Sequence, residues 1–404
     1  MEKHVNIGII GCGFRIRGLL KQREGIRVVA VCDPHPDSIA AARKEYGQDF
    51  RVFERYEDLV ADPGVDWVVV GSWNSQHCGH AVAALRAGKH VFCEKPLATT
   101  LDDCLAIREA ARESGRMFSF GLVLRYSPFY RKIHELLRAG TIGALISFEF
   151  NETINFWHGC YIMGGWRRLR ENAGTHLLEK CCHDMDIAIW LTDSLPVRVA
   201  SFGGLNFFRP ENQAHTRYDE QGREIHTTWP GHHLLNPFTS EKDIVDNQVV
   251  ILEYASGVRA TFHANCCSGI PERRMCLIGT EGAIRADALT GIIEVQRISA
   301  TPEMQRYDTN VADGHPGGHA GGDEVLVESL CRSMRAGEAP LVGVEEGIKS
   351  AVVSFAIDEA MDTGTVVNLN PLWARVNLKE PQSSAKNPVF PGKHSVSQTQ
   401  KEPL

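Results

Sequence analysis

The hydrophobic pattern in the first third of the chain alternates between two periods. Short apolar runs typical of buried strands lie at residues 5–10, 27–33, 65–72, 90–96 and 117–123. Segments with helical spacing lie between them and end at glycines, at residues 38–47, 75–88 and 99–115. Strands that alternate with helices in this way predict βαβ units built around a parallel sheet.

Beyond residue 124, strand patterns begin to dominate. After a helical segment, strand-like runs and then two further helical segments follow, at residues 128–140, 144–150, 198–204, 247–265, 273–287, 291–298, 323–337 and 345–364. Successive strands joined by tight turns favour a largely antiparallel sheet. We therefore expect an α/β protein with one domain at 1–124 and an α+β domain at 125–380. The polar segment 381–404, rich in proline and serine, is expected to be a disordered tail.

Composition narrows the class of protein. A chain of 404 residues, 43% of them hydrophobic, has room for two or three globular domains. The net charge of −7, without a long basic run, argues against nucleic acid or a membrane surface as a partner. No apolar run reaches the ~18 residues that span a bilayer, and the first residues lack the features of a signal peptide. The 12 cysteines are scattered through apolar segments, which favours buried free thiols in a reducing, cytoplasmic compartment.

A glycine pair follows the first predicted strand. Gly11 and Gly13 permit a tight turn that approaches a pyrophosphate at the start of a helix, although a plain structural turn explains them equally well. The third glycine of the dinucleotide pattern is replaced by Ile16, so the helix–strand packing has to accommodate a larger side chain. Asp33 ends the second strand, where an acid can bind ribose hydroxyls of NAD and repel the 2′-phosphate of NADP. Together these residues predict an NAD site.

Two further strand ends point to the same crevice, because ligands of open α/β sheets bind beyond the carboxyl ends of the strands. One is SWNSQH at 72–77, and the other is CEKP at 93–96, where the proline keeps Lys95 out of the helical conformation. A lysine fixed at a strand end is a better candidate for chemistry than a solvated surface charge. The residues expected to contact the cofactor are Gly11, Cys12, Gly13, Phe14, Arg15, Ile16, Asp33, Ser72, Trp73, Asn74, His77, Glu94, Lys95, Trp166 and Arg167.

The segment HLLEKCCHDMD at 176–186 permits three interpretations. The adjacent pair Cys181–Cys182 suggests a metal, but neighbours on a helix point to different sides, so no metal is expected. A merely buried helix is the second interpretation, but buried acids and histidines are costly unless they are paired. The third is proton transfer, because Glu179 and His183 share one helical face with Asp186, and histidine titrates near neutrality. We favour proton transfer.

Aromatic and basic residues gather in the stretches expected to face the nicotinamide: Arg125, Tyr126, Trp157, Tyr161, Trp166, Arg167, Arg168 and Lys180. Aromatic faces with hydrogen-bonding groups suit sugars, and the excess of Arg and Lys also suits a sugar with an acidic group. Taken singly, each residue is explained better as a surface arginine or a core tryptophan. His319 belongs to a glycine-rich stretch that either lines the pocket or only connects two elements. The residues expected to bind substrate are Arg125, Tyr126, Tyr161, Lys180 and His319.

The chain resembles the glucose–fructose oxidoreductase/inositol dehydrogenase/MocA family. The resemblance rests on SWNSQH, AGKHVFCEKPLATT, GLVLRYSP, GGWR, the helix with two cysteines and GGHAGGDE, and it covers roughly residues 5–370. It implies an N-terminal Rossmann domain, a C-terminal α/β domain with an open sheet, and a homodimer or homotetramer formed across that sheet. It also implies that the chain oxidises or reduces a sugar or cyclitol carbon with NAD(P).

The same resemblance implies roles for three residues. Members of the family carry Asp-x-x-x-His on the first helix of the second domain, and Glu179 and His183 occupy these positions. His183 is then the general base or acid, Lys95 hydrogen-bonds the reacting oxygen, and Glu179 completes the site. Because glutamate is one methylene longer than aspartate, the contact of Glu179 stays open between the substrate and the imidazole.

An NAD-dependent sugar or polyol dehydrogenase is the leading hypothesis. The alternative is an NAD-dependent glycosidase, as some relatives are, which oxidises a sugar transiently at C3, eliminates the aglycone and returns the hydride. An anionic glycoside such as a sulfoquinovoside would suit its basic cluster. A non-catalytic sensor on the same fold ranks last, because Lys95 and His183 are both present.

Overall fold

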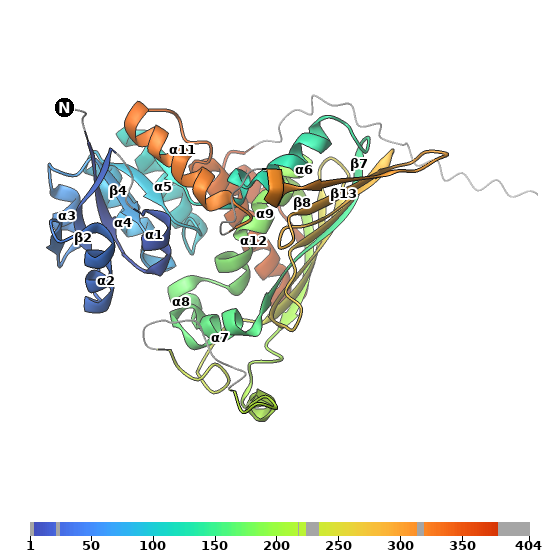
Figure 1. The fold of residues 1–404 in the computed structure, drawn as a ribbon, viewed down its shortest axis with the longest axis horizontal. Helices are drawn as coiled ribbons and strands as arrows, with labels where there is room; N and C mark the ends of the chain where they lie inside the picture. Colours follow the sequence, from blue (N-terminus) through green and yellow to red (C-terminus); the bar gives the residue numbers. More distant parts are fainter. Residues whose placement is uncertain (1–3, 22–24, 217, 224–233, 313–318, 379–404) are drawn as a thin grey trace, which may run out of the picture.

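The structure is a computed structural model that describes residues 4–21, 25–216, 218–223, 234–312 and 319–378. The tail expected at 381–404 lies outside the described residues. Within them the chain forms one sheet of six strands and one of nine, with several helices between the two sheets (Figure 1). None of the helices in these ranges combines the length and the apolar character that a bilayer span requires.

The six-stranded sheet comes from the N-terminal part of the chain. Its strands are β1 (Val5–Ile10), β2 (Ile26–Cys32), β3 (Arg51–Phe53), β4 (Trp67–Val70), β5 (His90–Cys93) and β6 (Phe118–Phe120). They lie in the order β3-β2-β1-β4-β5-β6, and the neighbouring pairs are parallel. The predicted parallel sheet is confirmed, and its strand order is that of a doubly wound dinucleotide-binding fold. The hydrophobic pattern misses β3 because its three residues lack a buried apolar run.

Helices connect these strands: α1 (Phe14–Leu19), α2 (Pro36–Tyr46), α3 (Tyr56–Ala61), the 3₁₀ turn η1 (Asn74–Gln76), α4 (His77–Arg86) and α5 (Leu101–Ser114). β4 is buried along its whole length, as expected for a parallel strand that is covered on both faces. Since parallel strands end at one edge of the sheet, the residues that follow β1, β4 and β5 meet there.

The nine-stranded sheet comes from the remainder of the chain. Its strands are β7 (Leu145–Asn155), β8 (Pro196–Gly204), β9 (Asn247–Tyr254), β10 (Arg259–Ser268), β11 (Arg274–Gly279), β12 (Gly282–Asp287), β13 (Ile292–Arg297), β14 (Met304–Asp308) and β15 (Val367–Asn368). Their order is β14-β13-β12-β11-β7-β10-β9-β8-β15. β7 and β10 run parallel, whereas the other neighbours are antiparallel within the described residues. The prediction of a largely antiparallel sheet is confirmed.

Helices lie against one face of this sheet. The helical elements of this part are η2 (Val123–Tyr126), α6 (Pro128–Arg138), α7 (Phe156–Gly164), η3 (Trp166–Arg168), α8 (Arg170–Ala173), α9 (His176–Thr192), η4 (Pro210–Thr216), α10 (Thr309–Ala312), α11 (Gly322–Ala336), α12 (Val344–Thr363) and α13 (Asn370–Arg375). Figure 1 shows α6, α9 and α12 on one side of the sheet, and α12 also packs against α5. α9 is buried on nearly every side. Its charged residues therefore need buried partners.

Candidate active site

The turn after β1 depends on glycine geometry. Gly11 has a φ of +81°, and a Cβ there would lie 2.5 Å from the backbone nitrogen of Ser72, so glycine is required. At Gly13, by contrast, a Cβ would meet no atom within 4 Å, so this part of the backbone faces open space. An accessible backbone turn between a strand and a helix fits the pyrophosphate of a dinucleotide.

Ile16 stands where the dinucleotide pattern has its third glycine, and it is fully buried. It faces Gly71, directly after β4, where a Cβ would lie 2.1 Å from Cγ1 of Ile16. The space that a glycine on the helix usually provides is therefore provided by a glycine at the end of the neighbouring strand. Close packing of helix and strand is kept, and the departure from the pattern does not count against a dinucleotide.

Asp33 directly follows β2. Its carboxylate accepts hydrogen bonds from the backbone N–H groups of Cys12 (2.8 Å) and His35 (2.9 Å). Burial, and then Asp33, raise the pKa of the Cys12 thiol to about 12, so Cys12 presents its backbone to this region rather than a thiolate. A carboxylate fixed beside the glycine turn can accept hydrogen bonds from ribose hydroxyls, and it fits NAD.

Two side chains after β4 hold backbone segments together. The ring nitrogens of buried His77 lie 2.7 Å from the carbonyl oxygen of Pro96 and 3.1 Å from that of Ser72. Asn74, also buried, donates to the carbonyl oxygen of Ala173 at 2.8 Å, just before α9. The His77 bonds join the segments that follow β4 and β5, and the Asn74 bond ties this edge of the parallel sheet to the second part of the chain. The cofactor contacts expected of His77 and Asn74 stay predictions.

Trp73 and Trp166 stack across the junction between the two parts of the chain. Their ring centroids are 5.2 Å apart and their planes differ by 12°. Arg167 lies over the Trp166 ring, with its Cζ 4.2 Å from the ring centre. The same Cζ is 4.9 Å from the centre of the Tyr161 ring. Arg167 also donates to the hydroxyl of Tyr161 at 3.0 Å. Residues expected from the sequence to meet cofactor and substrate thus form one cluster.

Lys95, the second residue after β5, connects the parallel sheet to α9. Its Nζ donates to the backbone oxygen of Glu179 at 2.6 Å and lies 3.3 Å from Oε1 of the same residue. Nε of Arg167 donates to that Oε1 at 3.0 Å, so one carboxylate oxygen serves two cations. Burial alone raises the pKa of Glu179, but Lys95 and Arg167 outweigh it and hold this pKa well below its usual range. Glu179 is therefore a charged anchor rather than a proton carrier.

His183 lies one turn beyond Glu179 and is also buried. Its Nδ1 has no hydrogen-bond partner among the described residues, so the spacing of four does not produce a carboxylate–imidazole pair: Glu179 turns to Lys95 and Arg167 instead. Burial lowers the pKa of His183 well below its ordinary value, and Lys95 is the foremost of the charges that lower it further. The imidazole is therefore neutral at pH 7, the form that can accept a proton.

His319 approaches His183 from the segment that precedes α11, with 5.8 Å between the ring centroids. Its Nδ1 lies 3.1 Å from Oδ2 of Asp323. Asp323 also pairs with Arg15 at 2.8 Å, and Nε of Arg15 reaches Oε1 of Glu94 at 2.9 Å. This series of contacts runs from the glycine turn to His183, and it favours a pocket position for His319 over a mere connection.

Four charged side chains, three of them buried, form a network beside His183. Nζ of Lys180 lies 2.9 Å from Oε1 of Glu152, and Nε of Arg273 lies 2.7 Å from Oε2 of Glu152. The Arg273 guanidinium also binds both oxygens of Asp184, at 3.0 and 2.7 Å. Sequence reasoning finds Lys180 but misses the other three residues.

A signal for Glu152 is present in the sequence. Side chains alternate along a strand, and Phe148 and Phe150 are buried, so Glu152 falls on the same inward face of β7. A carboxylate on a buried strand face requires a buried cation. No comparable signal marks Arg273, because it precedes β11 and its partners come from β7 and α9.

Two predicted substrate residues are already engaged elsewhere. Arg125 forms a bidentate pair with Asp186, at 2.8 and 2.7 Å, so this carboxylate does not serve His183. Tyr126 is buried, and its hydroxyl lies near Ser329 on α11. The structure therefore does not bring the Tyr126 side chain to the cluster, because packing against α11 turns it away.

The cysteines are free thiols, as expected. Cys181 and Cys182 are buried in α9, and burial raises the pKa of the Cys182 thiol to about 12. In the part of the chain that the structure describes, no cluster of three or more His, Cys, Asp or Glu side chains could hold a metal ion. The adjacent cysteines are core residues.

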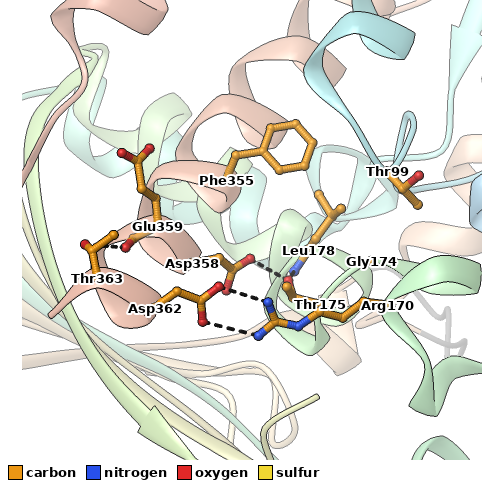
Figure 2. A pocket seen from close by; sticks show the side chains of 10 residues that line it. All are labelled: Thr99, Arg170, Gly174, Thr175, Leu178, Phe355, Asp358, Glu359, Asp362 and Thr363. Atoms are coloured by element: carbon orange, nitrogen blue, oxygen red, sulfur yellow. Dashed lines mark hydrogen bonds and ion pairs between the residues drawn. The ribbon is translucent and has the colours of Figure 1, made fainter. Parts of the chain in front are cut away.

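A cavity of about 430 Å³ lies at the N-terminal end of α9 (Figure 2). It is lined by Thr99, Arg170, Gly174, Thr175, Leu178, Phe355, Asp358, Glu359, Asp362 and Thr363. The hydroxyl of Thr175 caps α9 by accepting the Leu178 N–H at 3.1 Å, and it donates to Asp358. Burial raises the pKa of Asp358 to about 7. Neither Lys95 nor His183 lines this cavity, so it marks the capped helix end and not the reacting centre.

Two family models match the chain. The model described as "Oxidoreductase family, NAD-binding Rossmann fold" matches residues 5–122, and "Oxidoreductase family, C-terminal alpha/beta domain" matches residues 134–369. An inositol 2-dehydrogenase of Ralstonia nicotianae is 31% identical over 275 residues, which are 66% of this chain and 69% of the relative. Inositol 2-dehydrogenase 3 of Saccharopolyspora erythraea is 28% identical over 353 residues, 81% of this chain and 91% of the relative.

The fold is also similar to solved structures. Levoglucosan dehydrogenase, in a complex with NADH and levoglucosan, matches with a TM-score of 0.73 and 18% identity, over 91% of this chain and 100% of the other. At this identity the match shows the fold alone. The family models cover both parts of the chain, and the glycine turn and Asp33 fit the NAD that the description of the first model names. The chain therefore belongs to the glucose–fructose oxidoreductase/inositol dehydrogenase/MocA family of oxidoreductases, and its N-terminal part is an NAD-binding Rossmann domain.

Proposed function

We propose that the protein is an NAD-dependent oxidoreductase that acts on a CH–OH group of a sugar, sugar derivative or cyclitol. The observation that carries the proposal is the convergence of Lys95 and His183, from different parts of the chain, around Glu179. NAD, when bound, accepts or returns the hydride. The relatives named inositol 2-dehydrogenase support the substrate class.

The side chains of the protein transfer the proton and hold the reactants in position. Neutral His183 takes the proton of the substrate hydroxyl, and Lys95 donates a hydrogen bond to the same oxygen. Glu179 and Arg167 hold the Lys95 ammonium in position. The glycine turn and Asp33 hold NAD, with Trp73 and Trp166 beside it. Tyr161, Lys180 and His319 surround the substrate.

Two alanine variants test the proposal. Lys95→Ala and His183→Ala should each lower NADH formation from a polyol about 10³-fold, while the affinity for NADH, followed by cofactor fluorescence, changes less than about threefold. Lys132→Ala is the control, because Lys132 lies in an exposed pair on α6. Turnover that survives both substitutions would show that these roles are wrongly assigned.

The glycosidase alternative is not favoured, because the family models and the relatives named above point to oxidoreductases. The same assay decides it when aryl glycosides are added: aglycone release without net NADH formation would support a glycosidase. A sensor role predicts no turnover with any polyol, although NADH binds.

We also propose a homodimer or homotetramer formed through the face of the nine-stranded sheet opposite α6, α9 and α12. Phe202 and Val249 are paired neighbours on β8 and β9, and both are exposed together with Ile251. Adjacent exposed apolar side chains mark a contact surface. Light scattering should give a mass of two or four chains, and Phe202→Asp should reduce it to one chain. The cytoplasmic location stays a prediction.

A further inference from the structure

Lys180 is the one residue of α9 between His176 and Ile189 that is not buried, and all of these residues belong to the described chain. The solvent-exposed fraction of its side chain is 12%. A helix enclosed elsewhere on this stretch therefore opens to solvent at Lys180. This opening lies one helical turn before His183 and on the same face.

The charge of Lys180 acts on the whole candidate site. It is among the groups that lower the pKa of His183, of Glu179 and of His319. His158, on α7, is affected in the same direction. Lys180 is therefore near the reacting centre as well as near solvent, which is where a substrate has to lie.

Glu152, the partner of Lys180, is also bound by a second cation. Glu152 offers Oε1 to Lys180 at 2.9 Å, while its Oε2 is bound by Arg273, which also binds Asp184. Removing such charges from water is costly, and a well-packed apolar cluster often stabilises a fold as well or better. A buried network of this kind therefore calls for a reason other than stability, and its open end faces the site.

The pair offers both kinds of hydrogen bond within one small volume. An ammonium has three N–H donors, and Glu152 takes one of those of Lys180; a carboxylate oxygen can accept more than one bond. A hydroxyl group donates and accepts, so two adjacent hydroxyls can bind Lys180 and Glu152 together. An anionic group only accepts, and at this position it would lie beside the Glu152 carboxylate.

We propose that Lys180 and Glu152 form the subsite that recognises two neighbouring hydroxyl groups of a neutral polyol or sugar, next to the carbon that reacts at His183. This inference rests on the proposed function and adds the substrate feature that is recognised. Lys180 is then a specificity-determining residue and takes no part in proton transfer.

The test compares kinetics of the full-length holoenzyme with NAD and myo-inositol, glucose and glucuronate. Lys180→Met should raise KM for the neutral substrate that the wild type prefers about 10- to 100-fold, with kcat within about threefold. Affinity for NADH should not change. Glu152→Gln should also raise KM.

Two variants serve as controls. Lys180→Met/Glu152→Gln removes the pair and leaves Arg273 with Asp184, so it keeps the buried charge balanced and should fold even if Lys180→Met does not; it should show the same rise in KM. Lys132→Met breaks a Lys–Glu pair of the same length, 2.9 Å, on the surface of α6, and should leave KM unchanged.

The outcomes separate the two proposals. If the wild type oxidises no neutral polyol, the proposed function fails. If the wild type does oxidise one but the double variant leaves KM unchanged, or lowers kcat alone, the subsite is wrong while the proposed function stands. A wild type that prefers glucuronate, with a KM effect of Lys180→Met confined to it, would show an anion subsite instead.

Discussion

The Rossmann side of the site and the α9 side hold their functional groups in different ways. On the Rossmann side, the site is formed mainly by backbone groups. Gly11 packs against Ser72, Gly13 leaves the turn open, and Asp33 accepts hydrogen bonds from two backbone N–H groups. On the α9 side, buried side chains carry charge, and two of the carboxylates there are each shared by two cations. Glu179 serves two cations, and Glu152 serves two more.

The difference has a physical cause. Dinucleotides expose phosphates and hydroxyls that backbone groups can bind at little desolvation cost, so a turn suffices. Proton transfer and substrate recognition need ionisable side chains inside a dry region. Such groups are tolerated only when each has a partner, and the partners come from several elements. One side therefore depends on local geometry and the other on the assembled fold.

The largest effect should come from the charged side. Arg273→Met leaves the buried carboxylates of Glu152 and Asp184 with Lys180 as the remaining cation of the network, and it should lower the free energy of unfolding by about 3–5 kcal/mol in urea titrations. Arg297→Met breaks an exposed pair with Glu281 of 2.8 Å and should cost less than about 1 kcal/mol. Equal costs would show that burial of the network does not matter.

On the backbone side, the two glycines should separate stability from binding. Gly11→Ala introduces a Cβ into contact with Ser72 at a positive φ, and it should lower stability by about 2–3 kcal/mol and weaken NADH binding. Gly13→Ala meets no protein atom, so stability should change by less than about 0.5 kcal/mol while NADH binding still weakens. Full NADH affinity in Gly13→Ala would contradict a pyrophosphate at this turn.

Asp358, which accepts a hydrogen bond from Thr175 at the start of α9, should destabilise the folded state when its carboxyl is charged. Burial raises the pKa of Asp358 to about 7, so the folded protein keeps the proton that the unfolded chain loses near pH 4. The contribution of Asp358 to stability is present below pH 4 and is lost as pH rises through about 7. Asp358→Asn should match the wild type near pH 4 and exceed it by about 1–2 kcal/mol at pH 8, by urea titration. A difference that does not depend on pH would contradict this assignment.

The smallest effect concerns the pH profile of oxidation. Because the pKa of His183 is lowered, its base form persists below pH 6.5, where an ordinary imidazole is mostly protonated. Between pH 8 and pH 6.5, kcat/KM should therefore fall by less than about twofold, and the acid limb should lie below pH 6.5. A midpoint at or above pH 6.5 would mean that the charged surroundings do not act on His183 as described.

The sequence predicts the Rossmann side well, because its signals are local: a strand, a glycine turn and an acid at the next strand end. Even there it cannot show that Gly71 makes room for Ile16, since the two come from different strands. On α9 the sequence indicates Glu179 and His183 but leaves open whether Glu179 contacts the imidazole or the substrate. The competing partners, Lys95 and Arg167, are distant in the sequence or on another helical turn, and only the assembled fold brings them to Glu179.

Lys95 takes both of its acceptors, a carbonyl oxygen and a carboxylate oxygen, from the single residue Glu179. This cross-link has a consequence for chimeras made by recombining family members between the two parts of the chain. A breakpoint near residue 124 separates the lysine from its glutamate, so a donor with aspartate at position 179 offers a side chain one methylene shorter. Such hybrids will need the lysine loop and the helix to be transplanted as a unit, whereas the glycine turn and its packing partners Gly71 and Ser72 all lie before the breakpoint.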